Sequence, residues 1–273
     1  MSIIMDGKAL ALEIKEKVKE MTNVSDKTYF LTIITVGDDE ASKVYVRNKI
    51  KSAEECGILC KHIRFEESIS ENKLIEYINE LKSVEFGNNI LVQLPLPKHI
   101  KEDKIIEAIG PLNDVDGFHP ENIGKLFTGK KARVACTPGG IMTLLNHYNI
   151  SLSGKHCVIV GRSNIVGKPM AALMLNENAT VTVCHSKTKN LSEITKQADI
   201  LIVAIGKSKF ITSDMIKEGC IVVDVGINRD ENGKLCGDVD FEQCKDKTSY
   251  ITPVPGGVGP LTVATLMYNC INK

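Results

Sequence analysis

The chain has 273 residues, which is enough for one large domain or, as we expect, for two smaller domains that each bury a core. Lys plus Arg and Asp plus Glu both number 34, so the formal net charge is zero and no overall field attracts nucleic acid or an anionic membrane. Nine Cys residues form no Cys-x-x-C pair and no cluster with His, which predicts reduced thiols, no metal site and a cytoplasmic location.

The first half of the chain has the pattern of alternating helices and strands. The N-terminus lacks a basic segment followed by an apolar one, and no apolar run has membrane-spanning length, so we expect a protein that is neither exported nor embedded in a membrane. Strands are predicted over residues 29–36, 58–65 and 89–94, and helices over residues 8–21, 38–57 and 71–84. This alternation predicts a parallel sheet with helices packed on its faces.

One predicted helix presents three polar groups on a single face. Ser42, Tyr45 and Lys49 are spaced i, i+3 and i+7, so a hydroxyl, a phenol and an amine project together. A solvent-facing helix surface would explain these residues equally well, and the choice depends on partners elsewhere in the chain. Gln93 is one candidate partner, because Pro95 ends its strand and places the amide at the carboxyl edge, where open α/β sheets bind ligands.

A turn-rich loop over residues 113–120 contains two carboxylates, Asp114 and Asp116. An ordinary Asx-rich turn and a ligand-binding loop both fit this composition, and the local sequence does not decide between them.

The second half of the chain has the organisation of a nucleotide-binding domain. Strands are predicted over residues 156–160, 180–184, 200–204, 221–225 and 249–252, and helices over residues 138–148, 167–175, 191–197, 215–218 and 261–270. Residues 229–234 have the composition of a surface loop, and residues 253–260 contain too much Pro and Gly for regular structure. The apolar last helix is expected to return to the first domain.

The segment between strand 156–160 and the following helix resembles a phosphate-binding loop. Gly161 permits a tight turn, Gly167 permits close approach of helix and strand, and the helix start offers free amides to a pyrophosphate. The pattern departs from Gly-x-Gly-x-x-Gly, so a purely structural turn remains the alternative. His185 and Ser186 follow the next predicted strand, 180–184, where the acidic residue typical of NAD sites is missing, and with Arg162 and Ser163 they could surround a 2′-phosphate. We therefore predict a preference for NADP over NAD.

Five motifs, taken together, resemble the methylenetetrahydrofolate dehydrogenase/methenyltetrahydrofolate cyclohydrolase family from about Asp6 to the C-terminus. They are Val36-Gly37 with Ser42, Tyr45 and Lys49; Val92-Gln93-Leu94-Pro95-Leu96-Pro97; Asp114-Val115-Asp116-Gly117-Phe118-His119-Pro120; Gly161-Arg162-Ser163 with Ile165-Val166-Gly167 and Pro169; and Pro253-Val254-Pro255-Gly256-Gly257-Val258-Gly259-Pro260. One departure is Asn113, where many members have Lys.

The resemblance implies an α/β protein of two domains with a cleft between them. It implies a catalytic folate-binding domain over residues 1–137, joined by the C-terminal helix 261–273, and a Rossmann-type NADP-binding domain over residues 138–260. It also implies a cytosolic homodimer that oxidises 5,10-methylenetetrahydrofolate with NADP and hydrolyses the product to 10-formyltetrahydrofolate, in one-carbon metabolism and purine biosynthesis.

The resemblance also implies roles for individual residues. Lys49 would be the main catalytic residue, oriented by Gln93, while Tyr45 would stack on the folate and Asp116 would bind the pterin; Ser42 has the least defined part. Further substrate contacts would come from Pro255, Gly256 and Gly257, and cofactor contacts from Gly161, Arg162, Ser163, Ile165, Val166, Gly167, His185, Ser186, Gly206 and Ile227.

The chemistry agrees with these residue types. A carboxylate can accept both N–H donors of the pterin edge. Hydride transfer mainly needs alignment, whereas ring opening needs proton transfer, for which a buried Lys beside a cationic intermediate could act as base or proton shuttle.

Three other classes of protein fit the sequence less well. A short-chain dehydrogenase also uses Tyr-x-x-x-Lys, but its glycine loop precedes the Tyr, whereas here Gly161 follows Tyr45. A shikimate dehydrogenase type of enzyme fits the architecture and leaves Gln93 and the Asp116 loop unexplained. A non-catalytic nucleotide-binding regulator would have no need to retain Lys49 with these partners.

Overall fold

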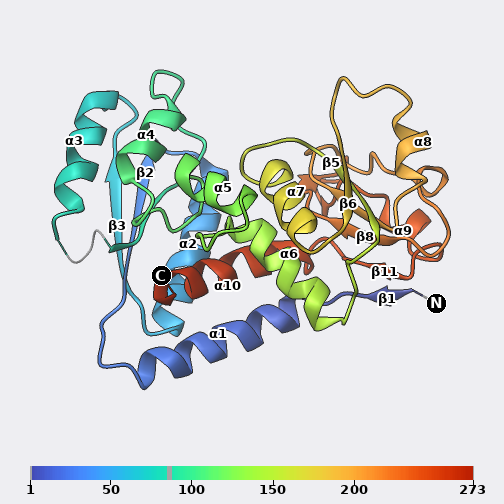
Figure 1. Ribbon diagram of the computed structural model, residues 1–273. Helices are drawn as coiled ribbons and strands as arrows, with labels where there is room; N and C mark the ends of the chain where they lie inside the picture. Colours follow the sequence, from blue (N-terminus) through green and yellow to red (C-terminus); the bar gives the residue numbers. More distant parts are fainter. Residues whose placement is uncertain (1, 85–87, 273) are drawn as a thin grey trace. The chain divides into compact units, whose positions relative to one another are not determined.

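The computed structural model describes residues 2–84 and 88–272, which form two compact units (Figure 1). The three-stranded unit comprises Leu12–Cys136 and the chain from Val263 onward. The six-stranded unit comprises Thr137–Thr262 and the chain up to Ala11. This division differs from the expected boundaries at the N-terminus, because strand β1 (Ile3–Ile4) pairs with β11 (Tyr250–Ile251) in the larger sheet.

The three-stranded unit is built on a parallel sheet in the order β3-β2-β4. The central strand is buried along nearly its whole length, because it has neighbours on both edges and consists almost wholly of apolar and β-branched residues. Its elements are β2 (Phe30–Val36), α2 (Glu40–Glu55), β3 (Leu59–Phe65), α3 (Glu71–Leu81), β4 (Ile90–Val92), α4 (Glu102–Ile109) and α5 (Pro120–Phe127).

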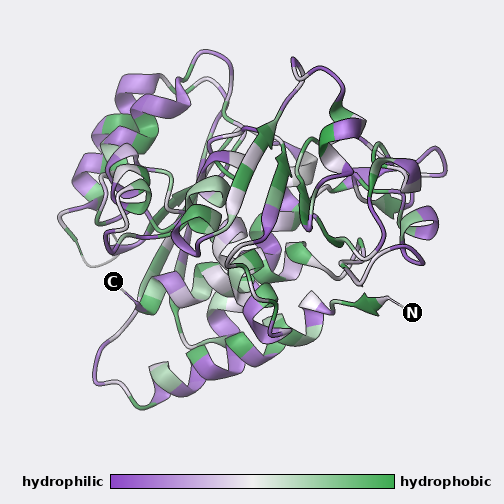
Figure 2. Ribbon diagram, turned by 45° about the vertical axis from the view of Figure 1, so that its right-hand side comes forward, coloured by the Kyte–Doolittle hydropathy of each residue, from purple (hydrophilic) through white to green (hydrophobic). Residues whose placement is uncertain are grey.

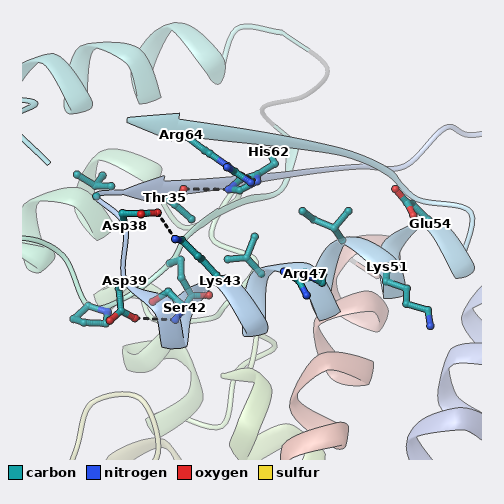
Figure 3. Close-up of a pocket in the computed structure, with 16 residues that line it drawn as sticks. Thr35, Asp38, Asp39, Ser42, Lys43, Arg47, Lys51, Glu54, His62 and Arg64 are labelled. Atoms are coloured by element: carbon teal, nitrogen blue, oxygen red, sulfur yellow. Dashed lines mark hydrogen bonds and ion pairs between the residues drawn. The ribbon is translucent and has the colours of Figure 1, made fainter. Parts of the chain in front are cut away.

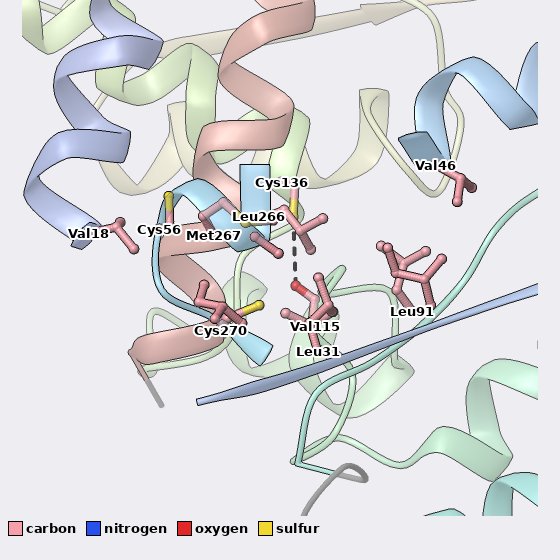
Figure 4. Packing of buried hydrophobic residues seen from close by; sticks show 13 residues of the cluster. Val18, Leu31, Val46, Cys56, Leu91, Val115, Cys136, Leu266, Met267 and Cys270 are labelled. Atoms are coloured by element: carbon pink, nitrogen blue, oxygen red, sulfur yellow. Dashed lines mark hydrogen bonds between the residues drawn. The ribbon is translucent and has the colours of Figure 1, made fainter. Parts of the chain in front are cut away.

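The core of this unit joins segments from both ends of the chain. Val18 of α1 (Gly7–Asn23) and Leu266, Met267 and Cys270 of α10 (Val258–Ile271) are buried in one cluster with Leu31 of the central strand (Figure 4). Figure 2 shows hydrophilic and hydrophobic residues mixed along α1, as expected for a helix with one buried side. The last helix therefore completes the core of the three-stranded unit.

The six-stranded unit contains an all-parallel sheet in the order β1-β11-β8-β7-β5-β6. Strands β5 (His156–Val160) and β6 (Thr180–Cys184) begin and end at the predicted residues. The remaining elements are α6 (Cys136–His147), α7 (Gly167–Asn176), α8 (Leu191–Thr195), β7 (Ile200–Val203), β8 (Ile221–Asp224), the hairpin β9 (Asn228–Arg229) and β10 (Leu235–Cys236), and α9 (Phe241–Cys244).

Two local predictions are wrong. The helical turn expected over residues 215–218 lies upstream, as the 3-10 turn Ser213–Met215. The segment 253–260 is not wholly irregular, because α10 begins at Val258 and includes Pro260 in its first turn. Proline is tolerated there, since the first amides of a helix have no partner within the helix. The short helices α4 and α5 were not predicted at all.

The nine Cys residues are free, as predicted, and Cys136, Cys157 and Cys184 are buried. In the part of the chain that the structure describes, no three His, Cys, Asp or Glu side chains form a group able to hold a metal ion. A search of the same residues found no helix with the length and apolar character needed to cross a membrane.

Candidate functional site

The start of helix α2 is fixed by a cap that also engages Ser42. The Oδ2 atom of Asp39 accepts the backbone N–H of Ser42 at 2.8 Å. The Ser42 side chain also hydrogen bonds Asp39, and these two bonds lower the pKa of the Asp39 carboxyl. Ser42 therefore takes part in forming the helix, while Tyr45 and Lys49 lie further along the same face.

Lys49 and Gln93 are brought together by α2 and the end of β4. The Nζ atom of Lys49 donates to Oε1 of Gln93 at 3.0 Å. The orientation of the Gln93 amide is set locally, because its Nε2 donates to the Leu94 carbonyl at 2.8 Å and its backbone N–H donates to Ile34 at 2.9 Å. The amide oxygen is thus left to face the amine. Tyr45 keeps 40% of its surface exposed, which leaves its ring free to pack on a planar ligand.

Asp114 organises the loop that follows α4. This carboxylate is 3% exposed and accepts the backbone N–H groups of Gly117 at 3.1 Å and His119 at 2.7 Å, together with the amide of Asn122 at 3.1 Å. The Asx-turn interpretation of the loop therefore applies to Asp114. The sequence contained the signal for this role, because Asp followed three residues later by Gly is a typical turn pattern.

Asp116 has a different environment on the same loop. Its half-buried carboxyl receives a long contact of 3.8 Å from the thiol of Cys136. Burial raises the pKa of Asp116, the positive charge of Lys49 opposes this shift, and the negative charge of Asp114 adds to it. The charge of Lys49 therefore acts on Asp116, so the loop and helix α2 contribute to one site.

A cavity of about 680 Å³ lies beside this group and is lined by residues of α2, β2 and β3 (Figure 3). Ser42 and Gln93 belong to its wall, whereas Tyr45, Lys49 and Asp116 do not. His62 and Arg64 line it from β3, and burial together with the charge of Arg64 lowers the pKa of His62. The cavity thus adjoins the Lys49 and Gln93 pair. Its further charged lining residues, which were not predicted, are Asp38, Asp39, Lys43, Arg47, Lys51 and Glu54.

The predicted cofactor residues of the six-stranded unit all follow the carboxyl ends of neighbouring parallel strands. The loop from Gly161 follows β5, and His185 and Ser186 follow β6. Gly206 follows β7 and Ile227 follows β8. Because the sheet order is β8-β7-β5-β6, these segments lie along one sheet edge, and the β5 and β7 pair marks the point where the strand order reverses.

The loop after β5 packs closely against helix α7. A Cβ atom on Gly167 would lie 2.2 Å from the carbonyl oxygen of Gly161, and a Cβ atom on Gly161 would lie 2.3 Å from that of Ala204. Gly161 also has φ +132°, which side-chain-bearing residues rarely adopt. Ser163 Oγ accepts the N–H of Val166 at 3.1 Å. This narrow cradle at a helix start fits a dinucleotide pyrophosphate.

Among the other predicted cofactor residues, Arg162, Ser163, Ile165 and Ser186 are exposed. His185 is half-buried, and its Nδ1 accepts the N–H of Lys187 at 3.1 Å.

The loop with Pro255, Gly256 and Gly257 follows β11 in the six-stranded unit. Its carbonyl at Gly256 accepts the N–H of Lys8 at 2.8 Å. A Cβ atom on Gly7 would lie 2.0 Å from the Gly257 carbonyl oxygen, so the loop lies directly against the start of α1.

Comparisons with known proteins point to one family over nearly the whole chain. Residues 5–116 match the model of the tetrahydrofolate dehydrogenase/cyclohydrolase catalytic domain, and residues 135–273 match that of the NAD(P)-binding domain of the same family. The chain is 55% identical to a bifunctional protein FolD of Streptococcus thermophilus over 271 residues, which cover 98% of this chain and 95% of the relative.

Solved structures of similar proteins support the same comparison. The bifunctional enzyme FolD of Campylobacter jejuni is 52% identical with a TM-score of 0.97, covering 99% of this chain and 98% of that one. The Trypanosoma brucei FolD was solved in complex with NADP cofactor and an inhibitor. It is 34% identical with a TM-score of 0.93, and the match covers 99% of this chain and 96% of that one.

The cradle leads to a direct prediction for dinucleotide binding. Gly167→Ala would force its methyl group against the Gly161 carbonyl and widen the loop, so we expect the Kd of the dinucleotide to rise about tenfold or more. Fluorescence titration with a reduced dinucleotide measures this constant. Gly124→Ala is the control, because nothing lies within 4 Å of the added Cβ. Equal affinity of the Gly167→Ala variant and the unaltered protein would contradict the proposed cradle.

Proposed function

The chain belongs to the tetrahydrofolate dehydrogenase/cyclohydrolase family, and on this premise we propose how its residues share the work of the two reactions. The protein oxidises 5,10-methylenetetrahydrofolate to 5,10-methenyltetrahydrofolate with NADP and then hydrolyses the product to 10-formyltetrahydrofolate. The observation that best supports the division of roles is the hydrogen bond from Lys49 to Gln93, and the charge of the same amine lowers the pKa of Asp116 against the effect of burial.

We assign folate binding and catalysis to the three-stranded unit. Lys49 moves the proton in the hydrolytic step, in which water adds to the one-carbon cation and the ring opens. Gln93 orients the amine through a neutral oxygen. A carboxylate at this position would favour the charged ammonium and weaken Lys49 as a base, which the amide avoids.

Tyr45 and Asp116 position the substrate in this scheme. The exposed ring of Tyr45 stacks on the planar part of the folate, and the Asp116 carboxylate accepts the two N–H donors of the pterin edge. Ser42 donates to Asp39, the N-cap of helix α2, and so helps to fix the start of the helix that carries Tyr45 and Lys49. Pro255, Gly256 and Gly257 remain proposed substrate contacts from the six-stranded unit.

The six-stranded unit holds NADP along the sheet edge formed by the carboxyl ends of β5, β6, β7 and β8. Gly161, Val166 and Gly167 form the pyrophosphate cradle, and Ile165, Gly206 and Ile227 supply further contacts. Arg162, Ser163, His185 and Ser186 surround the 2′-phosphate, since no acid follows β6 to bind unmodified ribose. When bound, NADP accepts the hydride, and the residues contribute alignment.

We further infer that the protein works in the cytoplasm as a homodimer and binds folates rather than nucleic acid. The nine free thiols and the zero net charge support these inferences, together with the family resemblance.

Replacing Lys49 separates the two reactions. Lys49→Met keeps the length of the side chain and removes the amine, so we expect cyclohydrolase activity to fall about 100-fold or more. The absorbance of methenyltetrahydrofolate follows this step. Lys73→Met, which removes an exposed amine from α3 of the same unit, is the control and should stay within about twofold. Ring opening at near-normal rate in Lys49→Met would show that another group moves the proton.

Replacing Asp116 tests folate recognition. Asp116→Asn removes the charge and one acceptor, so we expect the KM for both folate substrates to rise about tenfold or more. Asp103→Asn, an exposed acid of α4 in the same unit, is the control. An unchanged Kd for folate in a direct titration of Asp116→Asn would rule out the proposed contact.

Replacing Arg162 tests the choice between cofactors. Arg162→Ala removes a charge from the 2′-phosphate, so the Kd for NADP should rise about tenfold while that for NAD changes little. Lys155→Ala removes an exposed cation before β5, at the opposite end of the strand, and serves as the control. A parallel loss for NADP and NAD would assign Arg162 to the pyrophosphate instead.

A further inference from the structure

A fully buried carboxylate connects two of the loops proposed to bind the cofactor. Asp238 lies between β10 and α9 and is 0% exposed. Its oxygens accept the backbone N–H groups of three successive residues after β7, from Ile205 at 2.7 Å, Gly206 at 3.0 Å and Lys207 at 2.8 Å. They also accept the side-chain amide of Asn228, after β8, at 2.8 Å. One side chain thus holds both strand ends.

A second buried carboxylate fixes Asp238 itself. Asp224, at the end of β8, accepts the backbone N–H groups of Gly226, Asp238 and Val239, each at 2.9 Å. Two glycines make room for this arrangement. A Cβ atom on Gly226 would lie 2.3 Å from Asp238 Cγ, and one on Gly237 would lie 1.8 Å from Asp224 Oδ2. These distances are too short for a side chain at either glycine. The segment 224–226 and the segment 237–239 therefore pack directly against each other.

From this geometry we propose that Asp238 is a positioning residue for the dehydrogenase reaction. It holds the loops of Gly206 and Ile227 in the shape that receives NADP, without touching the cofactor itself. The inference rests on the proposed assignment of these two residues to the cofactor site. Gly206 has φ +65° and no neighbour within 4 Å of an added Cβ, so local packing around its α-carbon does little to hold this loop.

A carboxylate is required because all four partners are donors. An ionised Asp is an acceptor only, and its two oxygens provide enough lone pairs for four N–H groups. An Asn of the same shape would turn an NH2 group toward two of these donors and leave buried N–H groups unpaired. The loops would then relax away from the arrangement that Asp238 imposes.

The test is Asp238→Asn in the full-length protein, compared with Asp199→Asn. Asp199 lies just before β7, where it accepts the N–H of His156 at 2.7 Å and pairs with Lys217 at 2.5 Å. It is therefore an acid of the same unit that binds backbone at the opposite end of the sheet. Three quantities are measured. They are the Kd of NADP by titration, the KM for NADP and the kcat of the NADP-dependent oxidation of methylenetetrahydrofolate, and the cyclohydrolase activity without NADP.

We expect Asp238→Asn to raise the Kd and KM of NADP about tenfold or more and to retain cyclohydrolase activity. Asp199→Asn should keep the Kd of NADP within about twofold, even where both variants lose thermal stability. A Kd unchanged in Asp238→Asn, or raised equally in Asp199→Asn, overturns the proposal.

A second variant covers the case in which Asp238→Asn does not fold. Asn228→Ala removes one of the four donors and should raise the Kd of NADP about threefold, and no rise would again overturn the proposal. Failure of the proposed function itself would be distinct, because the unaltered protein would then not reduce NADP with methylenetetrahydrofolate.

Discussion

Buried loops outside the sheets must find partners for their backbone N–H groups, and in this protein aspartate side chains provide several of them. A loop cannot use the ladder bonds of the sheet, and an unpaired buried amide is costly. In the three-stranded unit Asp114 accepts the amides of Gly117 and His119. In the six-stranded unit Asp238 accepts those of residues 205–207. Both units thus use a buried carboxylate to shape a loop beside a ligand site that we propose.

The use of a buried carboxylate to bind loop amides explains why the neighbouring acids Asp114 and Asp116 differ in role. Asp114 and Asp238 are 3% and 0% exposed, and each has three or four donors around it. Asp116 lies two residues after Asp114 on the loop that Asp114 holds, yet the donor to its carboxyl among the residues that the structure describes is a weak one, the Cys136 thiol at 3.8 Å. This environment leaves acceptor capacity for the pterin contact that we propose. The number of donors already committed distinguishes the structural acid from the one available for binding.

Prediction from sequence succeeded where local pattern and tertiary structure require the same thing. Strands β5 and β6 were predicted to the residue, because both the central strand β5 and the edge strand β6 are short runs made mostly of β-branched residues. Helices α4 and α5 have eight residues each, too few to show a helical period clearly. The start of α10 was missed because the composition around Pro260 suggested an irregular segment, although a first helical turn accepts proline.

The residues of the candidate site likewise fall into those that the sequence predicts and those that it does not. Spacing alone placed Ser42, Tyr45 and Lys49 on one helix, and the proline after β4 placed Gln93 at the sheet edge. No pattern in the sequence indicated Asp238, because its four donors come from segments ten and about thirty residues away. Long-range hydrogen bonds of this kind leave no periodic trace. A ligand-binding motif can therefore be recognised from the sequence, whereas the acid that gives the motif its shape is seen only when the strands are assembled.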